Sequence, residues 1–331
     1  MIETVVREDV AGGRLDTWLA GRFTYNSRNQ WREAVRTGTI LIDGRRVRPS
    51  TTLRAGMRIS FHPEERPEPP VNSDFSLVHE DRHILVVDKP GNIPCHPGGA
   101  YFANTLWRIL KKRFGDIHLA GRLDRETSGL IVAARTSAAA AEFAQRKKAF
   151  AEKRYLALLH GRFPENEILA EGFMRDRTPD DLAAGGTIRK KRVYSAVANH
   201  GFEWETASTV FKTVARGALK NGGGEVSLVE ASLKTGRTHQ IRATTLALGY
   251  PIVGDKTYGL DERFFAGFAE GTLSDEDRKL LVLERQALHC AGISFRHPES
   301  GETLSFESPL PAEIAETFNF NTGETLGCSG Y

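Results

Sequence analysis

Apolar residues recur at helical spacing twice near the start of the chain. The segments 13–23 and 27–38 are therefore predicted to be short helices, the second capped by Ser27 and ended by Gly38. Their apolar faces would form a miniature core together. The residues of this predicted core are Leu15, Trp18, Leu19, Trp31, Ala34 and Val35.

Strand-like alternation follows the two helices. The segment 39–47 predicts a strand that ends in an Asp-Gly turn, and the segment 55–62 predicts a second strand. The polar segment 63–73 contains four prolines, which favours a stiff, extended linker. We therefore expect a small helix–helix–hairpin domain over residues 1–62, which this linker separates from a second domain that begins near residue 74.

The second domain, predicted to span residues 74–317, mixes helix and strand patterns. Strands are predicted at 75–80, 83–90, 129–135, 153–161 and 226–235, helices at 104–115, 136–150 and 238–249, and a hairpin at 293–309. Strands that pair both locally and across helices favour an α+β fold with a mixed, largely antiparallel sheet flanked by helices. Residues 318–331 are expected to form a flexible tail.

The composition limits the setting of the protein. No apolar run approaches the roughly 20 residues of a membrane span, and the first residues lack the apolar centre of a signal peptide. Three cysteines, Cys95, Cys290 and Cys328, are odd in number and widely spaced, which favours reduced thiols over a disulfide framework. These features predict a cytoplasmic globular protein.

Positive charge is concentrated at one end of the chain. Residues 13–62 carry ten arginines against three carboxylates, a formal charge of +7, although the whole chain sums to only +3. Arg28, Arg32 and Arg36 fall four residues apart and would form one stripe on the second helix. Since the planar guanidinium suits bidentate phosphate contacts, this pattern indicates a module that docks on a polyanion, with a merely solvated surface as the alternative.

The pentapeptide "HEDRH" (79–83) raises a second function class, a zinc peptidase. That chemistry requires His79 and His83 one turn apart on a helix, with the glutamate beside the metal. Both flanks are strand-like here, so the two imidazoles are not expected to converge. We therefore expect no metal site at this position.

One aspartate stands out in the segment "GRLDRETSGL" (121–130). Asp124 lies between Arg122 and Arg125, in a turn-forming loop just before a predicted buried strand. An ordinary loop carboxylate would cap a turn or form a surface ion pair. The alternative is a reactive carboxylate that cations hold ionised beside a polyanion.

Two further segments carry polar residues in places where chemistry is plausible. In "KRYLALLHG" (153–161), Lys153 and Tyr155 fall on the same face of a predicted strand, where the tyrosine could also simply pack. In "KTGRTHQIRATTLALG" (234–249), Thr238 is the expected N-cap, so Arg237 would lie at the positive end of the helix dipole. A cation there calls for an anion, and that anion could be a carboxylate such as Asp124 or an RNA phosphate.

These motifs carry two family resemblances. The pattern from "RLDTWLA" to "IDGRRVRPSTTLRAGMRI" in residues 13–62 resembles the alpha-L RNA-binding domain of a small-subunit ribosomal protein. Five segments resemble, in order, the RluA-type pseudouridine synthases: "LVHEDRHILVVDKPGNIPCHPG", "GRLDRETSGLIVAART", "KRYLALLHG", "KTGRTHQIRATTLALGYPIVGDKTYG" and "RQALHCAGISFRHPESGE". The second resemblance runs from about residue 76 to residue 310.

The resemblance implies the reaction and the catalytic residues. A uridine in folded RNA would become pseudouridine without metal, nucleotide or redox cofactor, because the change is an isomerisation. Asp124 would be the essential carboxylate, which attacks the anomeric carbon, attacks the uracil ring, or takes the ribose 2′ proton. Arg237 would be its cationic partner, and Tyr155 would pack on the uracil and take part in proton transfer at carbon 5.

The resemblance also implies RNA contacts. Arg122 matches the arginine expected to fill the gap left by an extruded base, and Gly121 stands where many family members have histidine. Lys89, Gln240 and Arg242 are candidates for contacts to the RNA backbone. In the small domain, the candidate RNA-binding residues are Arg28, Arg32, Arg36, Arg45 and Arg46.

The substrate follows less directly from these motifs. The added RNA-binding domain favours large-subunit ribosomal RNA, with transfer RNA as the alternative substrate. A catalytically silent RNA-binding factor on the same scaffold is the competing function. We expect a monomer that needs no protein partner.

Overall fold

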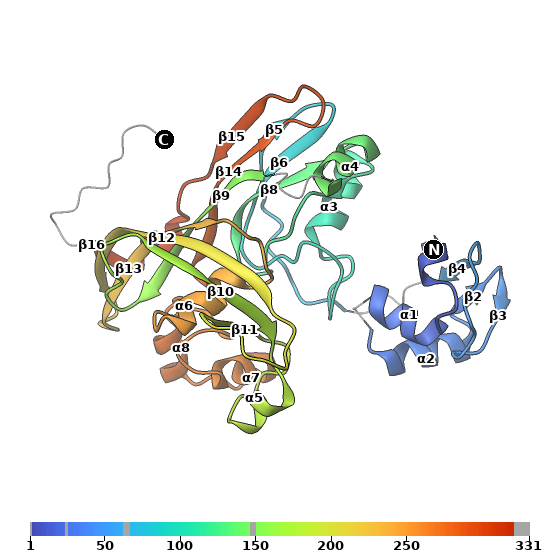
Figure 1. The fold of residues 1–331 in the computed structure, drawn as a ribbon, viewed down its shortest axis with the longest axis horizontal. Helices are drawn as coiled ribbons and strands as arrows, with labels where there is room; N and C mark the ends of the chain where they lie inside the picture. The colour runs from blue at the N-terminus through green and yellow to red at the C-terminus, as the bar shows by residue number, and fades with distance from the viewer. Residues whose placement is uncertain (1, 24–25, 62–66, 146–149, 321–331) are drawn as a thin grey trace. The chain divides into compact units, whose positions relative to one another are not determined.

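The structure is a computed structural model that describes residues 2–23, 26–61, 67–145 and 150–320. The chain divides into two compact units, residues 1–73 with 93–115, and residues 74–92 with 116–331 (Figure 1). Residues 93–115 thus group with the first unit, although the sequence analysis assigned them to the larger domain. The proposed division into domains stays a prediction.

The N-terminal part of the first unit consists of two helices and a four-stranded sheet. Its elements are β1 (Ile2–Val5), the 3-10 helix η1 (Glu8–Val10), α1 (Leu15–Arg22), α2 (Arg28–Thr37), β2 (Ile40–Ile42), β3 (Arg45–Arg46) and β4 (Arg58–Phe61). The strands pair antiparallel in the order β1-β4-β2-β3. The predicted order of helix, helix and hairpin is confirmed, whereas β1 was not predicted.

Local signals set the ends of these elements. The Ser27 side chain and the Gln30 side chain cap each other's backbone N–H at the start of α2, and Gly38 ends the helix with φ 80°. Between β2 and β3, Asp43 and Gly44 both adopt positive φ, 50° and 74°. Two such residues form the tight turn that the Asp-Gly pair predicts.

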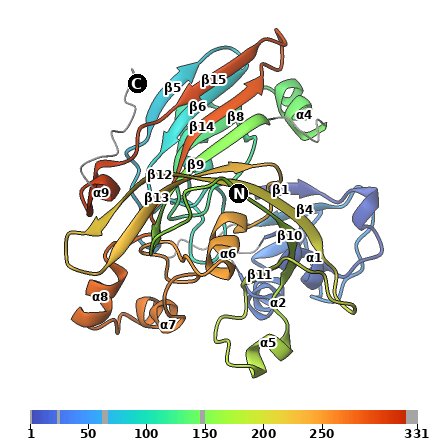
Figure 2. The same ribbon diagram turned by 60° about the vertical axis from the view of Figure 1, so that its left-hand side comes forward.

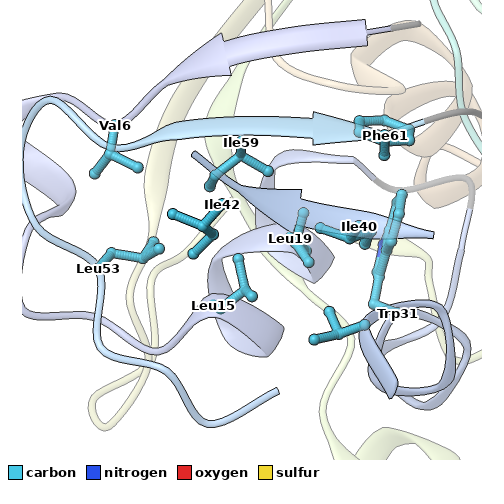
Figure 3. Close-up of a cluster of buried hydrophobic side chains, with 10 residues drawn as sticks. Val6, Leu15, Leu19, Trp31, Ile40, Ile42, Leu53, Ile59 and Phe61 are labelled. Atoms are coloured by element: carbon cyan, nitrogen blue, oxygen red, sulfur yellow. The ribbon is translucent and has the colours of Figure 1, made fainter. Parts of the chain in front are cut away.

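A cluster of buried side chains joins the helices to the sheet (Figure 3). Leu15 and Leu19 of α1 and Trp31 of α2 pack against Ile40, Ile59 and their neighbours on the strands (Figure 3). Four of the six residues predicted for this core are buried, while Trp18 and Ala34 are partly buried against it. The N-terminal module therefore has an apolar core of its own.

The rest of the first unit contains the helix α3 (Leu106–Phe114), which Thr105 caps. Ahead of α3, the Glu68 carboxylate accepts the backbone N–H groups of Phe102, Ala103 and Asn104 at 2.9, 2.8 and 2.7 Å. These bonds hold the described part of the predicted linker against the turn that precedes α3. Three of the four linker prolines lie in that part, and Pro63 lies outside the described residues.

The second unit is built on one twelve-stranded sheet. Its strands are β5 (Ser76–Glu80), β6 (Ile84–Lys89), β7 (His118–Leu119), β8 (Ser128–Ala134), β9 (Phe150–His160), β10 (Ile168–Asp176), β11 (Arg192–Ser195), β12 (Glu205–Leu219), β13 (Glu225–Leu233), β14 (Leu288–Arg296), β15 (Thr303–Glu307) and β16 (Phe318–Phe320). The main order is β11-β10-β12-β13-β9-β14-β8-β6-β5. Among the described strands only β14 and β8 pair in parallel, so the prediction of a mixed, largely antiparallel sheet is confirmed.

Helices flank this sheet, as predicted. They are α4 (Ser137–Gln145), α5 (Pro179–Ala183), α6 (Gln240–Ala247), α7 (Arg263–Glu270), α8 (Asp275–Leu281) and α9 (Ala312–Ala315). Figures 1 and 2 both show α6, α7 and α8 together on one side of strands β10–β13. Ala243 of α6 packs in one cluster with Tyr258, which follows the helix, and with Met174 and Ala207 of the sheet.

Three sequence predictions need correction. The helix predicted at 238–249 begins only at Gln240, and its N-cap is His239, in the left-handed region with φ 57°, rather than Thr238. The helix predicted at 136–150 is present over Ser137–Gln145, residues 146–149 lie outside the described ones, and Phe150 belongs to β9, where it pairs with Phe295. The predicted tail begins with a strand, since Phe318–Phe320 pairs with β12; its remaining residues, 321–331, lie outside the described ones.

Candidate active site

The loop between β7 and β8 carries Asp124, and buried donors fix this loop from behind. Lys89 donates to the backbone oxygen of Arg125 at 3.2 Å, and Lys256 pairs with the Glu126 carboxylate at 3.0 Å. Gln286 donates to the Thr127 hydroxyl at 2.6 Å. The Asp124 backbone is therefore held in place by charged and amide groups that face away from solvent.

Arg242 is the cation that pairs with Asp124. One guanidinium nitrogen, Nη1, lies 2.7 Å from Asp124 Oδ2. The other two bind Asp255, with Nε and Nη2 at 2.6 and 2.9 Å from its two oxygens. Because Asp255 also accepts the backbone N–H groups of Thr257 and Tyr258, the guanidinium has one fixed orientation, which aims its free edge at Asp124.

Asp124 is ionised in this arrangement. Partial burial would by itself raise the pKa of its carboxyl group, but the charge of Arg242 and the proximity of His239 outweigh burial and lower the pKa below its ordinary value. His239 Nε2 lies 3.5 Å from Asp124 Oδ1, and its Nδ1 lies 2.9 Å from the Tyr258 hydroxyl. Burial lowers the pKa of His239, with Asp124 opposing, so this imidazole is neutral at pH 7.

Tyr155 lies on β9 and borders the same cleft as Asp124. It is 7% exposed, faces Cys290 across the β9–β14 pairing, and its hydroxyl bonds the Cys290 thiol. Burial raises the pKa of that thiol to about 12, so Cys290 is a neutral thiol beside the tyrosine. The cleft holds about 390 Å³ of open space including its mouth.

The predicted pairing of Arg237 with Asp124 is wrong. Arg237 borders the cleft, but its Nη1 pairs with Glu205 at 2.9 Å and its Nε donates to the Thr206 carbonyl. Arg237 precedes α6, so it extends along the rim, whereas Arg242 lies in the first turn of α6 and faces inward. The carboxylate that pairs with Arg237, just before α6, is therefore Glu205.

Three residues predicted to touch the RNA backbone are buried instead. Lys89 is fully buried and donates to the carbonyls of Pro90 and Arg125. Gln240 bonds Ser208 and Thr209 of β12, and Arg242 holds the two aspartates. These side chains position the site rather than reach solvent. Arg122, by contrast, is exposed and borders the cleft, and its predicted role beside an extruded base stays a prediction.

The arginines predicted to bind RNA in the N-terminal module differ in their ion pairing and in their exposure to solvent. Arg28 pairs with the buried Asp16 at 3.2 Å, and Arg36 lies 3.5 Å from Glu33. Arg32 is half-buried, with its Nε shielded from solvent. Arg45 and Arg46 are exposed on β3. Arg45 and Arg46 on the hairpin therefore keep their positive charge exposed, whereas the Asp16 carboxylate partly neutralises the arginines of the second helix.

The "HEDRH" segment lies on the hairpin between β5 and β6, not on a helix. His79 and His297 both approach Asp81 Oδ2, at 2.9 and 3.2 Å. Within the described residues, no group of three or more metal-ligating side chains is arranged to hold a metal ion. Nor does any helix in that part of the chain have the length and apolar character to span a membrane.

Sequence reasoning missed His239, Asp255 and Gln286 as parts of the site. His239 could have been found, because it lies in the same "GRTHQIR" motif as Arg242. Asp255, in "IVGDKTYG", and Gln286, in "RQALHC", sit in segments that were quoted for the family resemblance but given no role. Only the fold shows that these three segments meet.

Comparison with known proteins assigns the class. Residues 83–247 match the family model of RNA pseudouridylate synthase, and residues 13–59 match that of the S4 domain. The chain belongs to the RNA pseudouridylate synthase family and is an isomerase. The expected family and the added RNA-binding domain are thereby confirmed.

Individual relatives cover nearly the whole chain. Ribosomal large subunit pseudouridine synthase D of Xanthomonas campestris is 32% identical over 324 residues, covering 94% of this chain and 90% of the relative. Ribosomal large subunit pseudouridine synthase C of Vibrio cholerae is 29% identical over 327 residues and covers 94% of each. Among solved structures, human RNA pseudouridylate synthase domain containing 1 aligns with TM-score 0.58 and 25% identity, over 77% of this chain and 92% of that one.

Proposed function

We propose that this enzyme converts specific uridines of large-subunit ribosomal RNA to pseudouridine and that Asp124 is its essential carboxylate. The observation that carries the proposal is the ionised Asp124 held by Arg242 in one cleft with Tyr155. The relatives named as ribosomal large subunit pseudouridine synthases support the choice of RNA. Transfer RNA is the alternative substrate.

The cleft suits a base that has left its stack. A uracil inside a helix is out of reach, so the target nucleotide is extruded into the cleft. Arg122 at the rim would fill the vacated position, and Tyr155 would pack on the uracil face. The bond from nitrogen 1 to the ribose breaks, a bond from carbon 5 forms, and one proton passes from carbon 5 to the solvent while nitrogen 1 gains one. Atoms and electrons balance without a cofactor.

Arg242 and His239 would keep Asp124 reactive. The guanidinium holds the carboxylate ionised, and the neutral imidazole limits its rotation. An ionised carboxylate can act as nucleophile or base. Attack on the anomeric carbon, attack on the uracil and removal of the ribose 2′ proton all fit this geometry. Uridine deuterated at ribose carbon 2 separates the last from the others, because only proton removal gives a primary isotope effect.

Replacement of Asp124 tests the proposal. Asp124→Asn should lower turnover on ribosomal RNA by more than about a thousandfold, near the upper range for a positioned acid–base group. RNA affinity should fall far less. Asp116→Asn, an exposed carboxylate ahead of the same loop, is the control and should keep activity. Turnover retained in Asp124→Asn would contradict the assignment.

Mapping of pseudouridines in cells with and without the gene tests the substrate. We expect one or more sites in large-subunit ribosomal RNA to disappear on deletion and to return with the wild-type gene, but not with Asp124→Asn. Sites lost only from transfer RNA would establish the alternative. Loss of no site would favour a silent RNA-binding factor.

We further propose that the enzyme works as a monomer in the cytoplasm, with its cysteines reduced. Cys95 and Cys290 are buried and form no disulfide, which agrees with a reducing compartment. Cys328 lies outside the described residues. Sedimentation of the purified enzyme at working concentrations should give the mass of one chain, 36.6 kDa.

A further inference from the structure

A second hollow adjoins the Asp124 cleft. It shares Arg122, Leu123 and Tyr155 with that cleft and holds about 270 Å³ of open space including its mouth. Its two cationic side chains are Lys153 and Arg122, and most of the remaining wall is apolar. The catalytic scheme above uses none of this wall except Arg122 and Tyr155.

Lys153 is the unusual group in this hollow. It precedes Tyr155 by two residues on β9, so both side chains lie on the same face of the strand. Its ammonium lies 3.9 Å from the centre of the Phe150 ring. Burial lowers the pKa of Lys153, opposed only by Cys290. Across the described residues no carboxylate forms an ion pair with this ammonium.

The buried lysines of the unit show how an ammonium removed from water is normally satisfied. Lys191 pairs with Glu262 at 2.8 Å, Lys256 pairs with Glu126 at 3.0 Å, and Lys89 donates to two carbonyls. Lys153 is half-buried, and a charge partly removed from water without an anion is unfavourable. Beside its ammonium lie an aromatic face and a neutral thiol. The described residues therefore supply no anion to balance the positive charge of Lys153 in this hollow.

Gly121 keeps the space beside Lys153 open. A Cβ at this position would lie 3.5 Å from the Lys153 ammonium, so any longer side chain would enter the hollow. The neighbouring Arg122 is exposed, and no carboxylate of the described chain forms an ion pair with it either. Two cations, an open approach and no internal counter-ion define a site for an external anion.

We propose that this hollow binds one backbone phosphate of the RNA next to the extruded uridine, between Lys153 and Arg122. The inference rests on the proposed function, because it takes the adjoining cleft as the place of the uridine. The phosphates that flank an extruded nucleotide must lie beside the mouth of that cleft. The apolar walls would also accept a neighbouring base, but a base would leave the ammonium unanswered.

Salt dependence of binding tests the phosphate directly. Lys153→Met keeps a similar side-chain length and removes a half-buried charge, so the variant should fold. In the Asp124→Asn background, it should bind a large-subunit ribosomal RNA transcript about tenfold more weakly at low salt, as for a lost charged hydrogen bond. The log–log salt slope should fall by about 0.7–0.9, the value for one phosphate.

The control is Lys212→Met, which removes an exposed lysine of β12 outside both hollows. It should leave the slope unchanged. An unchanged slope in Lys153→Met would overturn the proposal. These measurements need no turnover, so a failure of Asp124 as the catalytic group would appear in the activity assay and leave the binding result intact.

Gly121 supplies a second pair of variants. Gly121→Glu places a carboxylate beside Lys153, whereas Gly121→Gln places a neutral group of the same size there. We expect Gly121→Glu to lower the log–log salt slope of RNA binding by the same amount as Lys153→Met. The double variant Gly121→Glu with Lys153→Met should lower the slope no further. Gly121→Gln should keep a clearly larger slope. Equal slopes for Glu and Gln would mean that bulk alone matters, and would favour a base as the occupant.

A neutral phosphate identifies the contact. A stem-loop carrying the mapped uridine is made with a methylphosphonate at each flanking position in turn. At one position wild type should bind about tenfold more weakly, while Lys153→Met should lose nothing further. Additive losses at every position would overturn the assignment of Lys153 to a phosphate.

Discussion

Arg242 pairs with the carboxylates of Asp124 and Asp255 at the same time, and this double pairing makes it, rather than Arg237, the cation beside Asp124. Its bidentate contact with Asp255 is buried, so the guanidinium has no freedom to turn away from Asp124. Arg237 lies on the rim with its side chain 37% exposed and pairs with Glu205, which is exposed as well. Arg242 is therefore a rigid, buried part of the site, whereas the Arg237 side chain can change its partners at the rim.

Substitution of the two arginines should separate these roles. Arg242→Met leaves Asp255 buried without its partner, which typically destabilises a fold by about 3–5 kcal/mol, and it also releases Asp124, so activity should vanish. Arg237→Met breaks a surface pair worth about 0–1 kcal/mol and should mainly weaken RNA binding. Urea unfolding and pseudouridine formation measure both effects. A larger loss of stability in Arg237→Met would contradict this distinction.

The parallel pairing of β8 with β14 sets the position of the Asp124 loop. Gly129 lies opposite Cys290 in this pairing, with φ 109°. A Cβ at residue 129 would lie 2.3 Å from the Cys290 carbonyl oxygen and 2.5 Å from its nitrogen, distances that real Cβ atoms do not show. The hydrogen bond of 3.0 Å between Ser128 and His289 adds to the same junction. Only glycine allows the two strands to approach this closely.

Gly129→Ala should therefore disrupt the junction. We expect a loss of more than about 3 kcal/mol in the free energy of unfolding, or no folded protein, because the backbone clash adds to the strain of positive φ. Gly249→Ala is the matched control, since residue 249 has φ 85° but open space around its Cβ position, and it should cost only about 1–2 kcal/mol. Similar unfolding midpoints for the two variants would show that contact at residue 129 does not matter.

Elements with their own local signals could be predicted from the sequence. The capping box at Ser27, the glycine stop at Gly38 and the Asp-Gly turn act within a few residues, so their outcome does not depend on the rest of the fold. The long strand β12 was missed, although Ala207, Thr209 and Phe211 alternate as buried residues along it. That alternation is carried partly by small and polar residues, which weakens the pattern.

The candidate site was predictable in its motifs but not in its pairings. Asp124 and Tyr155 were found because their segments are distinctive, and the structure brings both to one cleft. Which arginine reaches Asp124 depends on where α6 begins, and a left-handed residue at His239 shifts that start by one position. A sequence that permits two starts of a helix cannot by itself decide which face each side chain takes.

At the scale of the molecule, charge is divided between the units rather than spread. The ten arginines of residues 13–62 give +7, so the remaining chain carries −4. We therefore expect RNA attraction outside the site to come mainly from the N-terminal module, where Arg45 and Arg46 are exposed and Arg28 pairs with Asp16. This division predicts that docking and chemistry can be separated experimentally.

Removal of residues 1–61 should weaken RNA binding and broaden target choice more than it slows conversion of a bound uridine. The residues form their own apolar core, so their loss should leave the catalytic unit folded. The log–log salt slope of RNA binding should fall by about 0.7–0.9 for each phosphate contact removed. Single-turnover rates at saturating enzyme isolate the chemical step and should stay within a few-fold of the full chain.

A matched variant separates charge from mere presence of the module. Arg45→Gln with Arg46→Gln keeps the module folded, because both side chains are exposed, and should reproduce part of the loss in slope. The variant Arg7→Gln removes an exposed arginine that already pairs with Asp9 and should change the slope less. If the truncated enzyme binds ribosomal RNA with unchanged affinity, slope and selectivity, the module does not dock the substrate and the attraction must arise in the catalytic unit.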